Sequence, residues 1–144
     1  YETINFEIFE NIAIIRLNRP NSYNSLNAKM AKELLEISFE CDTNKKIRAI
    51  ILTGEGEKAF CAGGDLKSFH ETGNIGKHLK MVTHDLHGAI TKFSRMNAPL
   101  IVAINGVAAG AGLSFVGFAD LAIAKSSATF VSAYTKAGLT PDGS

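Results

Sequence analysis

Two short windows of the sequence hold most of its glycines. They are Gly54, Gly56, Gly63 and Gly64 in the first window and Gly106, Gly110, Gly112 and Gly117 in the second. Each window follows an apolar run that predicts a buried strand, and in open α/β sheets ligands bind at such strand ends. Small residues let a ligand approach the main chain, and a helix N-terminus offers N–H groups without partners. The two windows could therefore donate hydrogen bonds to one oxygen atom, although turns and tight helix packing would explain the same glycines.

Four other positions carry side chains with possible chemistry. Asp142 could act as a general acid or base, but Pro-Asp-Gly is also ordinary turn sequence. His84 and His87 are three residues apart on a predicted helix and could contact a metal ion, but the pattern suggests no third ligand. Cys61 has apolar neighbours and no basic one, which favours a packing role over a nucleophilic one. We therefore expect no metal site.

The second glycine window also matches a nucleotide-binding pattern. The spacing Gly106-x-x-x-Gly110-x-Gly112 is used by short-chain dehydrogenases to bind a pyrophosphate. Those enzymes carry it after their first strand, whereas here it follows several predicted strands. The segment Tyr134-Thr135-Lys136 also lacks their Tyr-x-x-x-Lys spacing, and the chain has no G-x-x-x-x-G-K-[ST] phosphate loop. A nucleotide cofactor is therefore not expected.

The elements that must position these loops alternate between strand and helix patterns. Residues 4–9 and 12–17 are rich in β-branched and aromatic residues and predict a hairpin. Asn27 is a suitable N-cap for an amphipathic helix that runs to about residue 40. The predicted elements that follow are a strand over 47–52, a helix over 75–96, a strand over 100–104, a helix over 111–118 and a strand over 121–124. Parallel strands joined by crossover helices define the α/β class.

Composition restricts the class of protein further. The chain has 144 residues, 46% of them hydrophobic, which suffices for the core of one domain. Its net charge is +1, without a basic run, so neither a nucleic acid nor an anionic membrane is an expected partner. Cys41 and Cys61 lie in differently patterned segments, which favours a reducing, cytoplasmic compartment. The sequence stops directly after the turn signal at Pro141, so we expect that more chain follows.

Several motifs occur in an order and spacing that point to a family. They are Ala13–Pro20, Tyr23–Leu26, Ile50–Gly54, Ala59–Lys67, Pro99–Gly106, Ala108–Gly112, Phe118–Asp120 and Gly138–Asp142. Over essentially its whole length the sequence resembles the enoyl-CoA hydratase/isomerase (crotonase) superfamily. The resemblance implies a crotonase-like spiral of ββα units, with mostly parallel strands and covering helices, that binds an acyl-CoA thioester. Residues 1–144 would form this core, without the C-terminal helical part of the family.

The resemblance also assigns roles to individual residues. The backbone N–H groups of Gly64 and Ala111 would form an oxyanion hole for the thioester enolate, in agreement with the convergence of the two glycine windows. The CoA would lie against Ser22, Tyr23, Ala62 and Lys67. No cofactor is implied beyond the CoA of the substrate. Members of the family assemble as trimers or dimers of trimers, so a homotrimer or a dimer of trimers is expected.

One departure from the family pattern concerns the reaction. At the positions where hydratases of the family carry two glutamates, this chain has Ser114 and Tyr134, and neither is a general base without an activating partner. Asp142 matches the essential aspartate of certain isomerases and of a dehalogenase in the family. An isomerase that relocates a double bond, or rearranges a ring-derived acyl-CoA, is therefore favoured. Two alternatives remain open: an enoyl-CoA hydratase with an altered acid/base set, and a noncatalytic CoA-thioester or protein-binding member.

Overall fold

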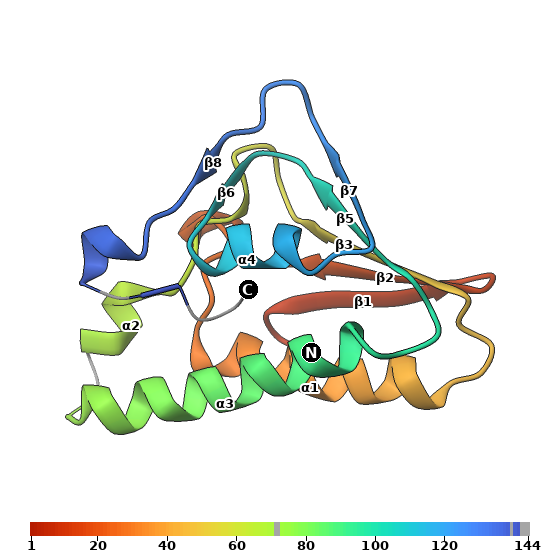
Figure 1. Cartoon of the computed structure of the whole chain (residues 1–144), viewed down its shortest axis with the longest axis horizontal. Helices are drawn as coiled ribbons and strands as arrows, with labels where there is room; N and C mark the ends of the chain where they lie inside the picture. Colours follow the sequence, from red (N-terminus) through yellow and green to blue (C-terminus); the bar gives the residue numbers. More distant parts are fainter. Residues whose placement is uncertain (71–72, 139, 142–144) are drawn as a thin grey trace.

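The chain forms two β-sheets and a layer of helices. A computed structural model describes residues 1–70, 73–138 and 140–141 (Figure 1). The larger sheet has the order β1-β2-β3-β5-β7, with bounds Ile4–Phe9, Ile12–Leu17, Ala49–Gly54, Leu100–Ile104 and Leu121–Ala124. The smaller sheet has the order β4-β6-β8, with bounds Ala59–Cys61, Val107–Ala109 and Phe130–Val131. Only the β1–β2 hairpin is antiparallel among the described pairs, which confirms the predicted α/β class.

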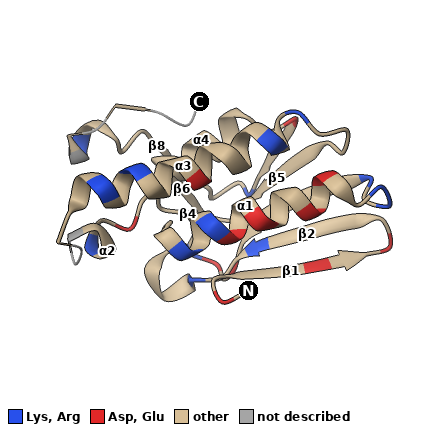
Figure 2. Cartoon of the chain, turned by 90° about the horizontal axis from the view of Figure 1, so that it is seen from below, with Lys and Arg blue, Asp and Glu red and all other residues tan. Residues whose placement is uncertain are grey.

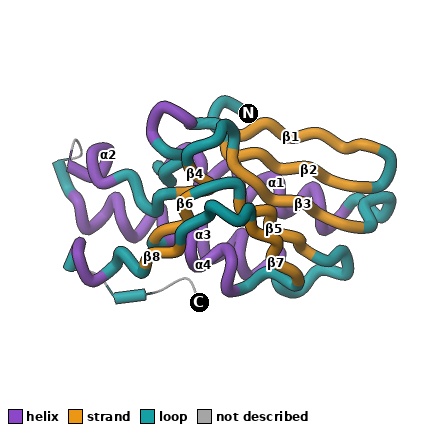
Figure 3. Tube along the Cα trace, turned by 90° about the horizontal axis from the view of Figure 1, so that it is seen from above, coloured by secondary structure: helices purple, strands orange, loops and turns teal. Residues whose placement is uncertain are grey.

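The path of the chain repeats a β-β-α pattern. Each of the pairs β3–β4, β5–β6 and β7–β8 sends its first strand to the larger sheet and its second to the smaller one. The helices α1 to α4 have the bounds Ala28–Thr43, Leu66–His70, Ile75–Phe93 and Ala111–Gly117, and the two 3-10 turns η1 and η2 have the bounds Pro20–Ser22 and Thr135–Ala137. Seen from above, the five strands lie side by side with the smaller sheet beside them (Figure 3). The chain therefore winds between two sheets, as the ββα spiral implies.

Helices α1 and α3 cover one face of the larger sheet. They lie below the strands in Figure 1 and side by side in Figure 2. The apolar face of α1 is buried, with Met30, Leu34 and Ile37 fully inaccessible to solvent. Asn27 caps this helix as predicted, because its side chain accepts a hydrogen bond of 2.9 Å from the N–H of Met30. None of the described helices combines the length and apolar character needed to cross a membrane.

The sequence prediction differed from the structure mainly in the first glycine window. Residues 54–64 were expected to form one loop after a buried strand, but the window contains β4, whose residues Ala59, Phe60 and Cys61 are all buried. Three residues are too few for an alternating pattern to emerge. The second glycine window likewise contains the short strand β6. Both strands form only because each finds a parallel partner in the smaller sheet.

A buried carboxylate fastens the beginning of the chain to α1. Glu33 is 3% exposed, and its side chain accepts hydrogen bonds from the N–H of Glu2 (2.8 Å), the N–H of Thr3 (3.0 Å) and the hydroxyl of Thr3 (2.6 Å). Burial by itself raises the pKa of Glu33, but these hydrogen bonds outweigh it and hold the pKa below its usual value. The ionised form is therefore favoured in the folded state.

We expect Glu33→Gln to lower the free energy of unfolding at pH 7 by about 2 kcal/mol, the typical value of a hydrogen bond to a charged group. A group with a lowered folded-state pKa stabilises the fold above its unfolded pKa, and this contribution disappears as the pH falls through the folded pKa. The difference between the two proteins should therefore shrink towards pH 3 in urea denaturation. Glu36→Gln on the exposed face of α1 is the control. An equal deficit of Glu33→Gln at pH 7 and pH 3 would contradict this explanation.

Candidate active site

The first glycine loop leaves β4 and is held by the segment before α1. The N–H of Leu26 donates to the carbonyl of Gly63 (2.7 Å), and the N–H of Asp65 donates to the carbonyl of Leu26 (2.8 Å). Leu26 and Gly64 form a parallel bridge. Gly63 has a φ of +95°, in the region that favours glycine. These contacts fix the peptide groups on both sides of Gly64.

The second glycine loop leaves β6 and begins α4. Gly110 has φ +50° and ψ −121°, the geometry of the first central position of a type II′ turn, where glycine is preferred. Its N–H donates to the carbonyl of Val131 (3.1 Å), and its carbonyl accepts from the N–H of Ser114 (3.1 Å). Ala111 is thus the first residue of the helix, where an N–H group has no partner within the helix.

The two loops touch without an intervening side chain. A Cβ built on Gly63 would lie 3.0 Å from the carbonyl oxygen of Ala109 and 3.5 Å from the Cα of Gly110. Within the described part of the chain, no acceptor is found for the N–H of Gly64 or of Ala111. The structure therefore brings together the two residues that the sequence analysis assigned as donors, with both N–H groups still able to donate.

Not every glycine of the two windows serves such a loop. A Cβ on Gly112 would lie 2.1 Å from the carbonyl oxygen of Cys61, and one on Gly106 would lie 2.5 Å from that of Lys58. These glycines allow close packing, so the alternative explanation from the sequence is correct for them. Cys61 is fully buried beneath α4, and burial raises the pKa of its thiol to about 12 although the N–H of Gly63 acts in the opposite direction. Its predicted packing role is confirmed.

A cavity of about 130 Å³ opens beside the two donors. Gly64 and Ala111 contribute to its wall, together with Tyr134. Most of the large apolar side chains that line it come from α2 and α3, namely Leu66, Phe69, Leu79, Val82 and Leu86. Such a cavity offers an apolar group a site next to two hydrogen-bond donors, which is the arrangement that an acyl thioester requires.

Tyr134, which lines this cavity, contacts Ser114 of α4. Their hydroxyl oxygens are 2.9 Å apart, a hydrogen bond in which either group can donate. Ser114 is only 5% exposed and lies in α4, whereas Tyr134 directly precedes η2. The sequence linked these residues only through the family pattern, and the structure places their side chains in contact. Asp142, the predicted proton shuttle, lies outside the described residues.

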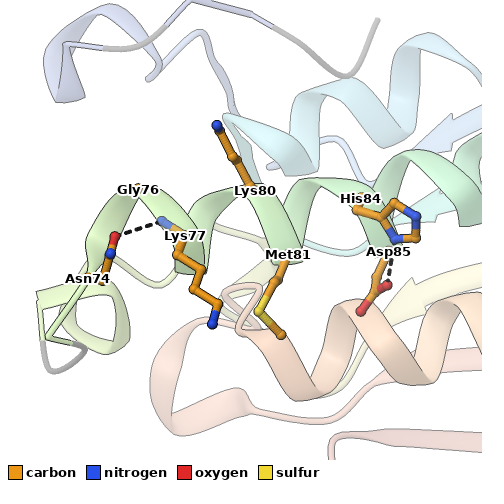
Figure 4. A pocket seen from close by; sticks show the side chains of 7 residues that line it. All are labelled: Asn74, Gly76, Lys77, Lys80, Met81, His84 and Asp85. Carbon is orange, nitrogen blue, oxygen red and sulfur yellow. Dashed lines mark hydrogen bonds and ion pairs between the residues drawn. The ribbon is translucent and has the colours of Figure 1, made fainter.

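A separate hollow lies on the exposed side of α3, away from the glycine loops (Figure 4). Lys77, Lys80, Met81, His84 and Asp85 are among its lining residues. The Nδ1 atom of His84 is 3.1 Å from a carboxylate oxygen of its neighbour Asp85. The described residues contain no group of three or more potential metal ligands, so they offer no third ligand beside His84 and His87.

A comparison with protein families decides where this chain belongs. Residues 7–144 match the family model of enoyl-CoA hydratase/isomerase. The chain is a member of this family. It is 41% identical over 143 residues to a probable enoyl-CoA hydratase of Rhodobacter capsulatus, covering 99% of this chain and 53% of the relative. It is 36% identical to the 1,2-epoxyphenylacetyl-CoA isomerase of Escherichia coli, covering 98% and 54%.

Solved structures of the family agree with the fold. The crystal structure of an enoyl-CoA hydratase from Bacillus anthracis superposes with a TM-score of 0.89 at 30% identity, covering 98% of this chain and 54% of that one. An enoyl-CoA hydratase from Polaromonas gives a TM-score of 0.86 at 32% identity, covering 97% and 55%. The chain thus spans about half the length of the family members that it matches.

The residues that the family pattern assigns to CoA come from η1, the first glycine loop and α2. The carbonyl of Tyr23 accepts a hydrogen bond of 3.0 Å from the N–H of Ala62. Tyr23 is 52% exposed and follows Ser22 at the end of η1. Lys67 is exposed in the first turn of α2. The structure thus joins Tyr23 to Ala62, with Lys67 on the next element, and their contact with CoA remains a prediction.

Three polar residues that organise this region were given no role in the sequence analysis. Asn24 is fully buried, accepts from the N–H of Arg19 (2.9 Å) and donates to the carbonyls of Glu55 and Ala59 (both 2.9 Å). A guanidinium nitrogen of Arg19 is 2.8 Å from a carboxylate oxygen of Asp65, directly after Gly64. All three lie within the motifs that the sequence shares with the family, so the sequence did mark them. Their roles could not be read from it, because their hydrogen-bond partners are up to 46 positions away in the chain.

Proposed function

We propose that the chain binds an acyl-CoA thioester, with the thioester oxygen on the N–H groups of Gly64 and Ala111, and that it relocates a double bond in the acyl group. The observation that carries this proposal is the pair of available donors at the edge of an apolar cavity, where the lining residue Tyr134 is hydrogen-bonded to Ser114 and neither side chain is a carboxylate. Donors fixed in advance at the place where negative charge develops are an effective means of enolate stabilisation.

In the proposed reaction, the carboxylate of Asp142 removes a proton from the carbon next to the thioester carbonyl. The electron pair of the broken C–H bond moves towards the thioester oxygen, where Gly64 and Ala111 stabilise the charge. The Asp142 carboxyl, whose proton can exchange with water in the meantime, then delivers a proton to the far carbon of the original double bond, and the double bond moves into conjugation with the carbonyl. One carboxylate suffices for this transfer, because the group that accepts the first proton also delivers the second.

A hydratase is the second candidate, and a relative supports it. The Rhodobacter capsulatus protein, 41% identical, is named a probable enoyl-CoA hydratase. Adding water requires a group that positions and activates it, and hydroxyl groups such as those of Ser114 and Tyr134 are not general bases at neutral pH without an activating partner. This difference favours the isomerase. A noncatalytic binding member is the third candidate, and such a protein would not require the carboxylate of Asp142.

A panel of acyl-CoA thioesters followed by mass spectrometry in heavy water tests the three candidates. An isomerase exchanges protons of the acyl group and shifts the double bond, whereas a hydratase adds one molecule of heavy water, about 20 mass units, to a trans-2-enoyl-CoA. A binding member does neither. We also propose that the protein is cytoplasmic and uses no cofactor besides the CoA of its substrate. We further propose that it assembles as a homotrimer or a dimer of trimers, and analytical ultracentrifugation would measure this oligomeric state.

We expect Asp142→Asn to slow the exchange of substrate protons by about a hundredfold to ten-thousandfold, the usual contribution of a general acid/base. Asparagine keeps the shape of the side chain but cannot accept the proton, so the affinity for the thioester should be retained. Asp42→Asn, on the partly exposed end of α1, serves as the control. Exchange by Asp142→Asn at close to the original rate would show that Asp142 belongs only to a turn.

A further inference from the structure

One of the residues that line the acyl cavity is a tyrosine that is held by the helix of the second donor. Ser114 lies three positions after Ala111 in α4, so both residues are on the same face of this helix. The rise between them is about 4.5 Å, and the Cβ atom of a helical residue leans towards the N-terminus. The Tyr134 hydroxyl, 2.9 Å from the hydroxyl oxygen of Ser114, is therefore fixed within about one helical turn of the donor, along the side of α4.

The other lining residues leave little room around this ring. Phe69 stands next to the first donor, since a Cβ built on Gly64 would lie 2.9 Å from its ring. Leu79, Val82 and Leu86 close the side formed by α3. The cavity volume of about 130 Å³ is close to that of an engineered apolar cavity of about 150 Å³ that holds one benzene molecule. An acyl chain that starts at the donors and enters this cavity thus has room for only about six carbon atoms before it meets the lining side chains, Tyr134 among them.

We propose that Tyr134, anchored by Ser114, limits the length of the acyl group, so that the site takes short-chain acyl-CoA thioesters. This inference rests on the proposed function and adds its substrate class. Tyr134 contacts the substrate, and Ser114 is a positioning residue that acts through Tyr134. The anchoring residue Ser114 is buried in the core. The residues that follow Tyr134 in η2, Thr135 and Lys136, are exposed instead. The ring is thus tied to the same rigid element that carries the donor of Ala111.

Binding of saturated thioesters to the full chain tests the inference, because saturated acyl groups have no double bond to relocate. Isothermal titration calorimetry with butanoyl-CoA and decanoyl-CoA should give at least about tenfold tighter binding of the shorter thioester, since a clash in a well-packed pocket has effects of this size. Tyr134→Ala should reduce the preference to within about threefold by improving the binding of decanoyl-CoA. Tyr134→Val provides a second variant if the alanine protein does not fold, as judged by circular dichroism.

Two variants separate the ring from its anchor. Tyr134→Phe and Ser114→Ala each remove the hydrogen bond but keep an aromatic ring at position 134, so each should give an intermediate preference. Combining them should change the preference no further, because both remove the same interaction. Thr135→Ala, at an exposed neighbouring position, is the matched control and should behave like the unmodified protein.

The outcomes distinguish the two proposals. Equal affinity of the unmodified protein for both thioesters, or an unchanged preference in Tyr134→Ala, overturns the length limit and leaves the proposed function intact. Failure of every acyl-CoA to bind, while the protein remains folded, overturns the proposed function itself. A preference that shifts in Tyr134→Ala but not in Ser114→Ala shows that the ring sets the length without its anchor and overturns the role of Ser114.

Discussion

Replacing Ala111 by proline should lower the turnover of an acyl-CoA substrate by about a hundredfold to a thousandfold, or about 2.7 to 4 kcal/mol of transition-state stabilisation. Proline has no N–H group, so the variant lacks the second donor and places a CH₂ group where the thioester oxygen would lie. The position tolerates proline structurally. Ala111 is the first residue of α4, a position where proline is favoured. The residue before a proline avoids the helical conformation, and Gly110 already does so with φ +50° and ψ −121°.

The matched control is Ala111→Gly, which shortens the side chain but keeps the N–H group. Its turnover should stay within about tenfold of the unmodified protein, because losing one donor costs more than this. Both variants should unfold at nearly the same urea concentration, since the proline removes no hydrogen bond of the helix. If the proline variant were folded and as active as the glycine variant, the assignment of this donor would be wrong.

Gly112→Ala should destabilise the fold by about 3 kcal/mol or more, at the upper end of what overpacking costs. The new Cβ would lie 2.1 Å from the carbonyl oxygen of Cys61 and 2.9 Å from its carbonyl carbon. Both atoms belong to the main chain of a buried strand, which cannot move aside as the end of a flexible side chain can. Helix α4 must therefore shift away from β4, and Ala111 must shift with it. Urea denaturation followed by circular dichroism measures the loss.

The same helix offers the control for this substitution. Gly117, the last residue of α4, has no atom within 4 Å of the position of an added Cβ. Gly117→Ala should leave the stability unchanged or raise it by up to about 1 kcal/mol, because alanine favours a helix more than glycine does. Equal effects of the two substitutions would mean that helix propensity, and not the contact with Cys61, explains the result.

The sequence by itself predicted the elements whose patterns are local. The strand over 12–17 was placed with its observed bounds, and the helix that Asn27 caps was expected through about residue 40 and ends at Thr43. Both follow from interactions between residues close in sequence: side-chain alternation in the strand, and a cap with i, i+3 and i+4 spacing in the helix. The two glycine loops were also found this way, because glycine windows at strand ends are visible in the chain itself, whereas the resemblance to the family singled out Gly64 and Ala111 within them.

Only the tertiary structure decided what depends on contacts between distant segments. Gly112 and Gly117 are the same residue type in one helix, yet one abuts the backbone of β4 and the other faces open space. The short strands β4 and β6 exist because they pair with each other, and the ring of Tyr134 reaches Ser114 across 20 positions. The physical reason is shared by all three cases. Their free energy comes from packing and hydrogen bonds across the fold, and a pattern of neighbouring residues does not contain it.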